Sequence, residues 1–149
     1  MGGLHMTLKG MVQRPNMMEL LLDRYLWMQA AFEKAWEEQS DLVISQTEWK
    51  ILGRIERDGL PVARITKNLH ITRQAIHKLI KNLSAKDLIK LYPMENNKKE
   101  RCIALTELGH ECYDIYTNIH AHIENQIAAN IGAGEMESLK AILQSDWGL

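Results

Sequence analysis

Apolar side chains recur every three or four residues over two long stretches of the chain, 16–39 and 106–131. This spacing predicts two amphipathic helices, because residues three and four apart share one helix face. Each stretch opens on an Asn or a Thr, side chains that can cap a first turn. In the first stretch Leu22, Leu26 and Trp27 lie off the main apolar stripe, so we expect this helix to be covered on two sides.

Three shorter helices are predicted between these stretches. Ser45 and Glu48 have the spacing of a capping box and open a helix that runs to about residue 58. A proline starts the next helix, over 61–69. After a tight turn a threonine caps a third helix, over 73–85. The order is helix, turn, helix.

Two short strands follow, 88–91 and 101–105, joined by a polar hairpin over 93–100. Such a hairpin directly after a helix-turn-helix is a wing. After Gly132 a last helix is marked by apolar residues from Met136 onward. We therefore expect a mainly α fold with a small β-wing, a winged helix-turn-helix whose N- and C-terminal helices form a dimerisation base.

The charges are distributed unevenly along the 149 residues, although the net charge is only −1. Arg64–Arg101 holds ten basic residues against three acidic ones, and the remainder holds eight basic and sixteen acidic residues. A basic middle with acidic flanks is typical of a nucleic-acid-binding face on an acidic protein. Ordinary solvated surface charge is the alternative.

The positions of the basic residues favour nucleic-acid binding over ordinary surface charge. On a helical wheel the helix over 73–85 has one apolar face and one polar, basic face. Gln and Arg side chains suit base edges, and Lys neutralises phosphate. The hairpin places further basic residues beside this helix. We expect the DNA contacts to come from Arg73, Gln74, His77, Lys78, Lys81, Lys98, Lys99 and Arg101.

The chain resembles the MarR family of multiple-antibiotic-resistance regulators over roughly residues 16–145. The resemblance is carried by Ser-Gln-Thr-Glu-Trp-Lys-Ile-Leu at 45–52, by Ile-Thr-Arg-Gln-Ala-Ile-His-Lys-Leu-Ile at 71–80 and by Ala-Leu-Thr-Glu-Leu-Gly at 104–109. It implies a homodimer held by its first and last helices, which binds a pseudo-palindromic operator, often as a repressor released by a small ligand.

The chain departs from that family at two places. The wing reads Asn97-Lys98-Lys99 where the family usually has Asp-Arg-Arg, so an ammonium replaces a planar guanidinium. His70 stands in the turn where Gly is common, and Thr66 where Ala is common. His adopts the left-handed backbone less comfortably than Gly does.

The expected organisation is a flexible arm over 1–15 and a single domain over 16–149. Within that domain 16–40 and 106–149 are the dimerisation helices and 45–105 is the DNA-binding lobe. The sequence has no signal peptide and no apolar run long enough to span a membrane, so we expect a cytoplasmic protein.

A small-molecule effector is a further expectation, with Tyr25, Trp27, Phe32 and Trp49 lining a pocket between base and lobe. Plain core packing is the competing interpretation of these aromatic residues. We expect no cofactor and no enzymatic activity, because nucleophile–base pairs, paired carboxylates and phosphate-binding glycine loops are missing.

Three alternatives to a ligand-released DNA-binding regulator stay open. A metal-responsive regulator would use histidines one helical turn from a carboxylate, as His110 is from Asp114 and His120 from Glu124. A redox-responsive one would use Cys102, near basic residues, or Cys112. A winged helix can also bind only protein, but such a module needs no basic recognition face.

Overall fold

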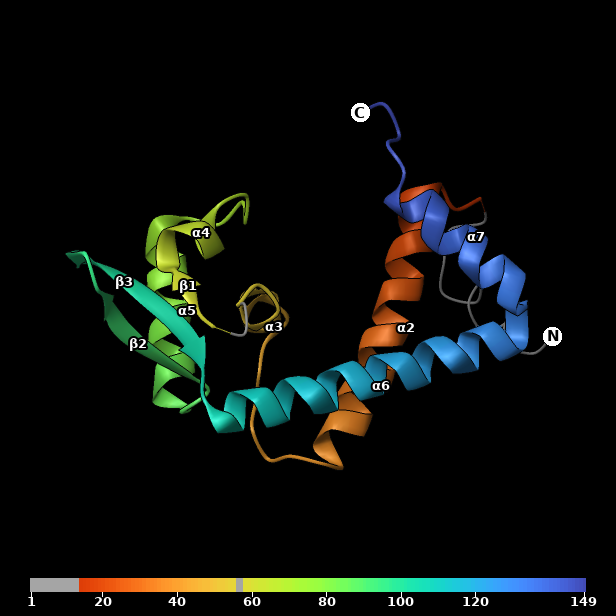
Figure 1. The fold of residues 1–149 in the computed structure, drawn as a ribbon. Helices are drawn as coiled ribbons and strands as arrows, with labels where there is room; N and C mark the ends of the chain where they lie inside the picture. Colours follow the sequence, from red (N-terminus) through yellow and green to blue (C-terminus); the bar gives the residue numbers. More distant parts are fainter. Residues whose placement is uncertain (1–13, 56–57) are drawn as a thin grey trace. The chain divides into compact units, whose positions relative to one another are not determined.

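The computed structural model describes residues 14–55 and 58–149, so most of the expected arm over 1–15 lies outside the described residues. The chain forms two compact units (Figure 1). One consists of residues 14–40 with 118–149, and the other of residues 41–117. Helix α6 contributes to both, because it spans Glu107–Ile131. The unit that contains the expected lobe over 45–105 thus includes the first turns of α6.

The first unit is built from α2 (Met17–Glu37), the C-terminal part of α6 and α7 (Ala133–Gln144). Asn16 caps α2 by accepting a hydrogen bond from the backbone N–H of Glu19. Phe32 is buried and stacks on the His120 ring, with 4.8 Å between ring centroids. Gly132, at a φ of 107°, separates α6 from α7. The long helices expected at both ends of the chain are confirmed.

The second unit holds α3 (Gln46–Leu52), α4 (Val62–Thr66) and α5 (Arg73–Ala85), of which α5 has the expected bounds. The expectation that α3 runs to residue 58 is wrong. Gly53 caps it, and the N–H groups of Arg54 and Ile55 bond to carbonyls three residues back, which is a tightened final turn.

The expected helix over 61–69 is also too long. Pro61 belongs to a short strand, β1 (Leu60–Pro61), which was not expected from the sequence, and it serves as N-cap of α4. Lys67 has an extended backbone, with φ −66° and ψ 129°, so α4 ends before it. A strand of two residues has too few positions to show an alternating pattern.

The wing is a β-hairpin of β2 (Ile89–Met94) and β3 (Asn97–Leu105), with β3 between β1 and β2 in an antiparallel sheet (Figure 1). The expected long polar loop over 93–100 is wrong, because most of its residues lie in strands. Pro93 is compatible with β2, since β2 is an edge strand. Exposed residues on the outer part of the hairpin hide the alternation that marks a strand.

The core of the second unit joins the three helices to the sheet. Helix α5 contacts both α3 and β2, and α4 contacts β1 and β3. Five aliphatic side chains at the centre have no solvent-accessible surface: Ile51, Leu52, Leu83, Leu88 and Ile103. This core fixes the side of α5 that carries Ile76, Ile80 and Leu83 and leaves the opposite side exposed.

A buried ion pair fastens the C-terminal end of α5 to the start of α3. The Lys86 ammonium donates to both carboxylate oxygens of Glu48, at 2.9 and 2.8 Å, and to the backbone oxygen of Val43. Glu48 is 4% exposed and also accepts from the Ser45 N–H, which completes the expected capping box. Lys86 therefore has a structural role, linking the end of α5 to the start of α3.

The Leu-Thr-Glu-Leu-Gly segment joins the start of the wing to the start of α6. The Thr106 hydroxyl donates to the backbone oxygen of Asp87, at 2.6 Å, and accepts from the N–H of Gly109. The backbone N–H of Thr106 donates to the oxygen of Leu88. A Cβ at Gly109 would lie 2.1 Å from that same oxygen, so only glycine permits this close approach.

We therefore expect Gly109→Ala to lower the free energy of unfolding by about 2 kcal/mol or more, because the Leu88 backbone must shift to admit a methyl group. Gly134→Ala is the matched control, since a Cβ at that position would meet no atom within 4 Å and α7 gains about 0.5–1 kcal/mol of helix propensity. Urea unfolding of both variants measures the difference. Equal stability of the two would contradict the close approach.

Lys86→Met should lower the free energy of unfolding by about 2 kcal/mol, because it leaves the Glu48 carboxylate buried without its cation. Because Lys86 is partly exposed, the expected loss of unfolding free energy lies at the lower end of the range for buried ion pairs. Adding Glu48→Gln should recover part of the loss, since no charge is then left buried. A double variant no more stable than Lys86→Met would argue against the ion pair as the cause.

Candidate nucleic-acid interface

The exposed face of α5 carries all five of the side chains expected to contact DNA from this helix. Arg73, Gln74, His77, Lys78 and Lys81 are exposed, whereas Ile76, Ile80 and Leu83 on the other side are buried. The structure therefore brings together a guanidinium, an amide, an imidazole and two ammonium groups on one side of one helix. These groups can donate to base edges and to phosphate oxygens.

The start of α5 is fixed by its cap and by the turn before it. Thr72 accepts a hydrogen bond from the Ala75 N–H through its hydroxyl oxygen, at 3.1 Å. In the turn, Asn68 and His70 have positive φ values of 64° and 54°. His70 thus takes the left-handed conformation that its place in the turn led us to expect. Leu69, between them, is buried and anchors the turn.

The wing contributes residues from β3. Lys99 and Arg101 are exposed, and Lys99 lies where the pairing register of the hairpin shifts, between the Pro93–Arg101 pair and the Met94–Asn97 pair. Arg101 pairs across the hairpin with Pro93 on β2. Lys98 also belongs to β3, but its side chain lies outside the described residues. The expected wing residues therefore belong to β3, with Lys98 and Lys99 in its irregular part and Arg101 in its regularly paired part.

Two cations of this unit take roles that were not expected from the sequence. Lys86 belongs to the basic middle segment, yet it is paired with Glu48 inside the fold. Arg54 lies outside that segment and bonds to backbone oxygens at the end of α4. Neither role has a local sequence signal, because the partners are many residues away in the chain.

The four aromatic residues expected to line an effector pocket belong to different units. Phe32 and Trp49 are buried in the cores of their own units, with Trp49 stacked on Tyr116 at 4.5 Å between centroids. Tyr25 and Trp27 are about half exposed on α2. A pocket between base and lobe stays a prediction.

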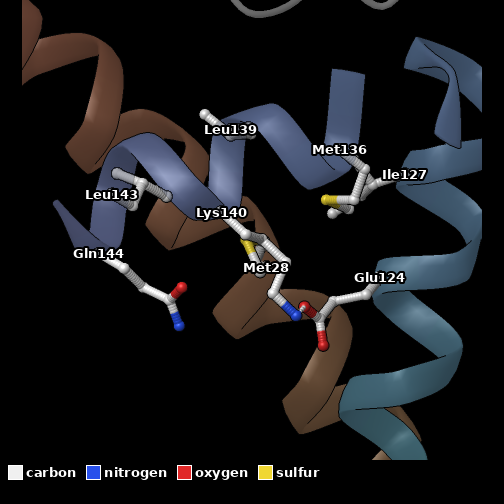
Figure 2. A pocket seen from close by; sticks show the side chains of 8 residues that line it. All are labelled: Met28, Glu124, Ile127, Met136, Leu139, Lys140, Leu143 and Gln144. Atoms are coloured by element: carbon white, nitrogen blue, oxygen red, sulfur yellow. Dashed lines mark ion pairs between the residues drawn. The ribbon is translucent and has the colours of Figure 1, made fainter. Parts of the chain in front are cut away.

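The first unit contains a pocket of its own, of about 270 Å³, between α2, α6 and α7 (Figure 2). Its wall is largely apolar, and the Lys140 ammonium points toward the Glu124 carboxylate at 2.8 Å. None of the four expected pocket residues lines it. The lining residues are Met28, Glu124, Ile127, Met136, Leu139, Lys140, Leu143 and Gln144.

The residues considered for metal and redox sensing differ in exposure, since both cysteines are buried and His120 is half-buried, whereas His110 and Asp114 are exposed. Cys102 and Cys112 are both buried, and burial, with Glu111 nearby, raises the pKa of the Cys112 thiol, which disfavours the reactive thiolate. Burial lowers the pKa of His120 against the opposing effect of Glu124. Over residues 14–55 and 58–149, no three His, Cys, Asp or Glu side chains are grouped to hold a metal ion.

No protein-family model matches the chain, and no curated protein sequence is significantly similar to it. Solved structures are similar in fold. The transcriptional regulator PA4135 shares 16% identity at a TM-score of 0.66, covering 87% of this chain and 94% of that one. S. aureus MepR in its complex with DNA shares 25% identity at a TM-score of 0.68, covering 87% and 95%. MepR bound to ethidium bromide shares 23% identity at a TM-score of 0.60, covering 87% of this chain and 92% of that one.

Among the residues that the structure describes, no helix has the length and apolar character to cross a membrane. The mainly helical fold with its small three-stranded antiparallel sheet matches these structures over 87% of the chain. The chain has the MarR-type winged-helix fold.

Proposed function

We propose that the protein is a transcriptional regulator that binds double-stranded DNA in a sequence-specific way, in the cytoplasm and without enzymatic activity. The observation that carries this proposal is the exposed polar and basic face of α5, which lies in one compact unit with a basic wing strand. In a winged helix the second helix of the pair enters the major groove and the wing reaches the backbone or minor groove. The MepR complex with DNA supports the same use of this fold.

The side chains divide by chemistry into base readers and phosphate contacts. Near the start of α5, Arg73 can bond guanine and Gln74 can bond adenine through paired hydrogen bonds. Lys78, Lys81 and Lys99 supply point charges for phosphates, and Lys98 and Arg101 extend this set along the wing. Because lysines replace guanidinium groups in the wing, wing contacts should depend less on base sequence.

The proposal includes a homodimer. Helix α2 exposes Leu22, Leu26 and Trp27, and α7 exposes Ile142 and Leu143, each by more than two fifths of its surface. Exposed apolar residues gathered on neighbouring helices usually mark an interaction surface. A second copy of the chain would cover them and place two copies of α5 on one duplex, which favours a pseudo-palindromic operator.

We also propose that the protein represses transcription and that a small effector releases it from DNA. The bound ethidium of MepR, an aromatic cation, and the largely apolar pocket of the first unit support a small ligand with an aromatic or apolar surface for this fold. None of the four aromatic residues predicted from the sequence lines that pocket, so Tyr25, Trp27, Phe32 and Trp49 stay a separate proposal for the effector.

Base reading and phosphate contact should respond differently to mutation. With a duplex selected from random DNA, Gln74→Ala should cost about 1–3 kcal/mol on the selected site and little on a scrambled duplex. Lys81→Ala should weaken binding to both and reduce the slope of log Kd against log salt by about one unit per contact. Fluorescence anisotropy over a salt series measures both. Equal losses of Gln74→Ala on the two duplexes would remove it from base readout.

The dimer predicts an inverted-repeat operator whose half-sites lie about 10 base pairs apart, one helical turn. Inserting about five base pairs between the half-sites turns one of them to the opposite side of the duplex, so affinity should fall to the non-specific range of about 10⁻⁴–10⁻⁶ M. A substitution of the same length that keeps the spacing is the control. A single asymmetric selected site, or unchanged affinity after insertion, would refute dimeric docking, and failure to select any sequence would favour a protein-interaction module.

A further inference from the structure

The Arg54 side chain bridges the end of α3 and the end of α4. Its Nη1 atom donates to the backbone oxygens of Ile65, at 3.1 Å, and of Lys67, at 2.7 Å. The backbone of Arg54 belongs to the tightened final turn of α3, and its N–H bonds to the oxygen of Ile51. Because Ile51 and Leu52 are fully buried, the arginine projects from a rigid base.

The end of α4 needs such a donor. The helix spans only Val62–Thr66, so its last carbonyls have no partners within the helix. Partial negative charge gathers at a helix C-terminus, and a guanidinium placed there satisfies the carbonyls and complements that charge. The Arg54 bonds therefore fix the point at which the chain leaves α4.

The segment from that point to α5 has few other constraints. Residues 67–72 connect the two helices, and only Leu69 among them is buried. Asn68 and His70 both hold left-handed backbone conformations, which cost energy for residues other than glycine and persist only when the surroundings enforce them. The Arg54 bond to Lys67 lies immediately before Asn68, where this strained turn begins.

We infer that Arg54 is a positioning residue for sequence readout: by holding the carbonyl oxygens of Ile65 and Lys67, it sets the turn that aims the N-terminal end of α5, with Arg73 and Gln74, at the bases. This inference rests on the proposed DNA-binding function. Arg54 acts through the backbone at the end of α4. Misplacing base-reading side chains by a small distance lowers affinity for the preferred sequence but leaves the charges that attract any DNA in place.

The test compares Arg54→Met with Arg64→Met, which removes the same charge from an exposed position on α4. Each variant is titrated with the duplex selected by the unmodified protein and with a scrambled duplex, over a salt series. For Arg54→Met we expect the ratio of the two affinities to fall about tenfold, similar to the effect of a mismatched base pair, with an unchanged salt slope on scrambled DNA. Arg64→Met should leave the ratio unchanged, and Arg54→Lys, which keeps a donor, should restore part of it.

Hydrogen exchange without DNA gives a second readout. The amides of Ala75 and Ile76, which donate to Thr72 at the start of α5, should exchange faster in Arg54→Met, while those of Ile51, Leu52 and Leu83 keep their protection. If Arg54→Met fails to fold, Arg54→Lys carries both measurements. Equal losses on the two duplexes with a shallower salt slope would make Arg54 a phosphate contact and overturn the inference, as would an unchanged ratio with unchanged exchange. If the unmodified protein prefers no sequence, the proposed function fails, while hydrogen exchange still tests the bond to the turn.

Discussion

One buried carboxylate fastens the C-terminal end of α5 to the start of α3. Glu48 accepts hydrogen bonds from the Ser45 N–H and from the Lys86 ammonium, and Lys86 also binds the Val43 oxygen. A carboxylate that is almost fully buried is tolerated only when it is paired and hydrogen-bonded. Glu48 therefore caps the start of α3 and fastens the end of α5, and its partner Lys86 fixes the loop before α3 through Val43. The exposed face of α5 has a defined direction because its far end is held in this way.

Much of this architecture is readable from the sequence, because caps and helix periodicity are local. Asn16, Ser45 and Thr72 each cap the helix that their position predicts, and the bounds of α5 agree with the apolar pattern. The five expected side chains of α5 share one exposed face for the same reason, since a helix of known bounds fixes which residues face together. Which of them contact bases was not accessible in this way and remains a proposal.

What the sequence did not reveal depends on contacts between distant residues. The strands of the wing were underestimated because their outer residues are exposed, so no alternation marks them. Strand β1 exists only through its pairing with Ile103 and Cys102 of β3. Lys86 could be told from a DNA-facing lysine only once its distance to Glu48 was known. The charge available to a nucleic acid is therefore smaller than the count of basic residues suggests.

The burial of both cysteines has a practical consequence. Cys102 lies in β3 at the centre of the sheet, and Cys112 lies in the first turns of α6, both within the 41–117 unit. Thiol reagents in solution reach such groups mainly when the surrounding structure opens. Each cysteine therefore serves as an internal reporter, and the rate at which it is alkylated measures how often the wing sheet or the start of α6 comes apart in the folded protein.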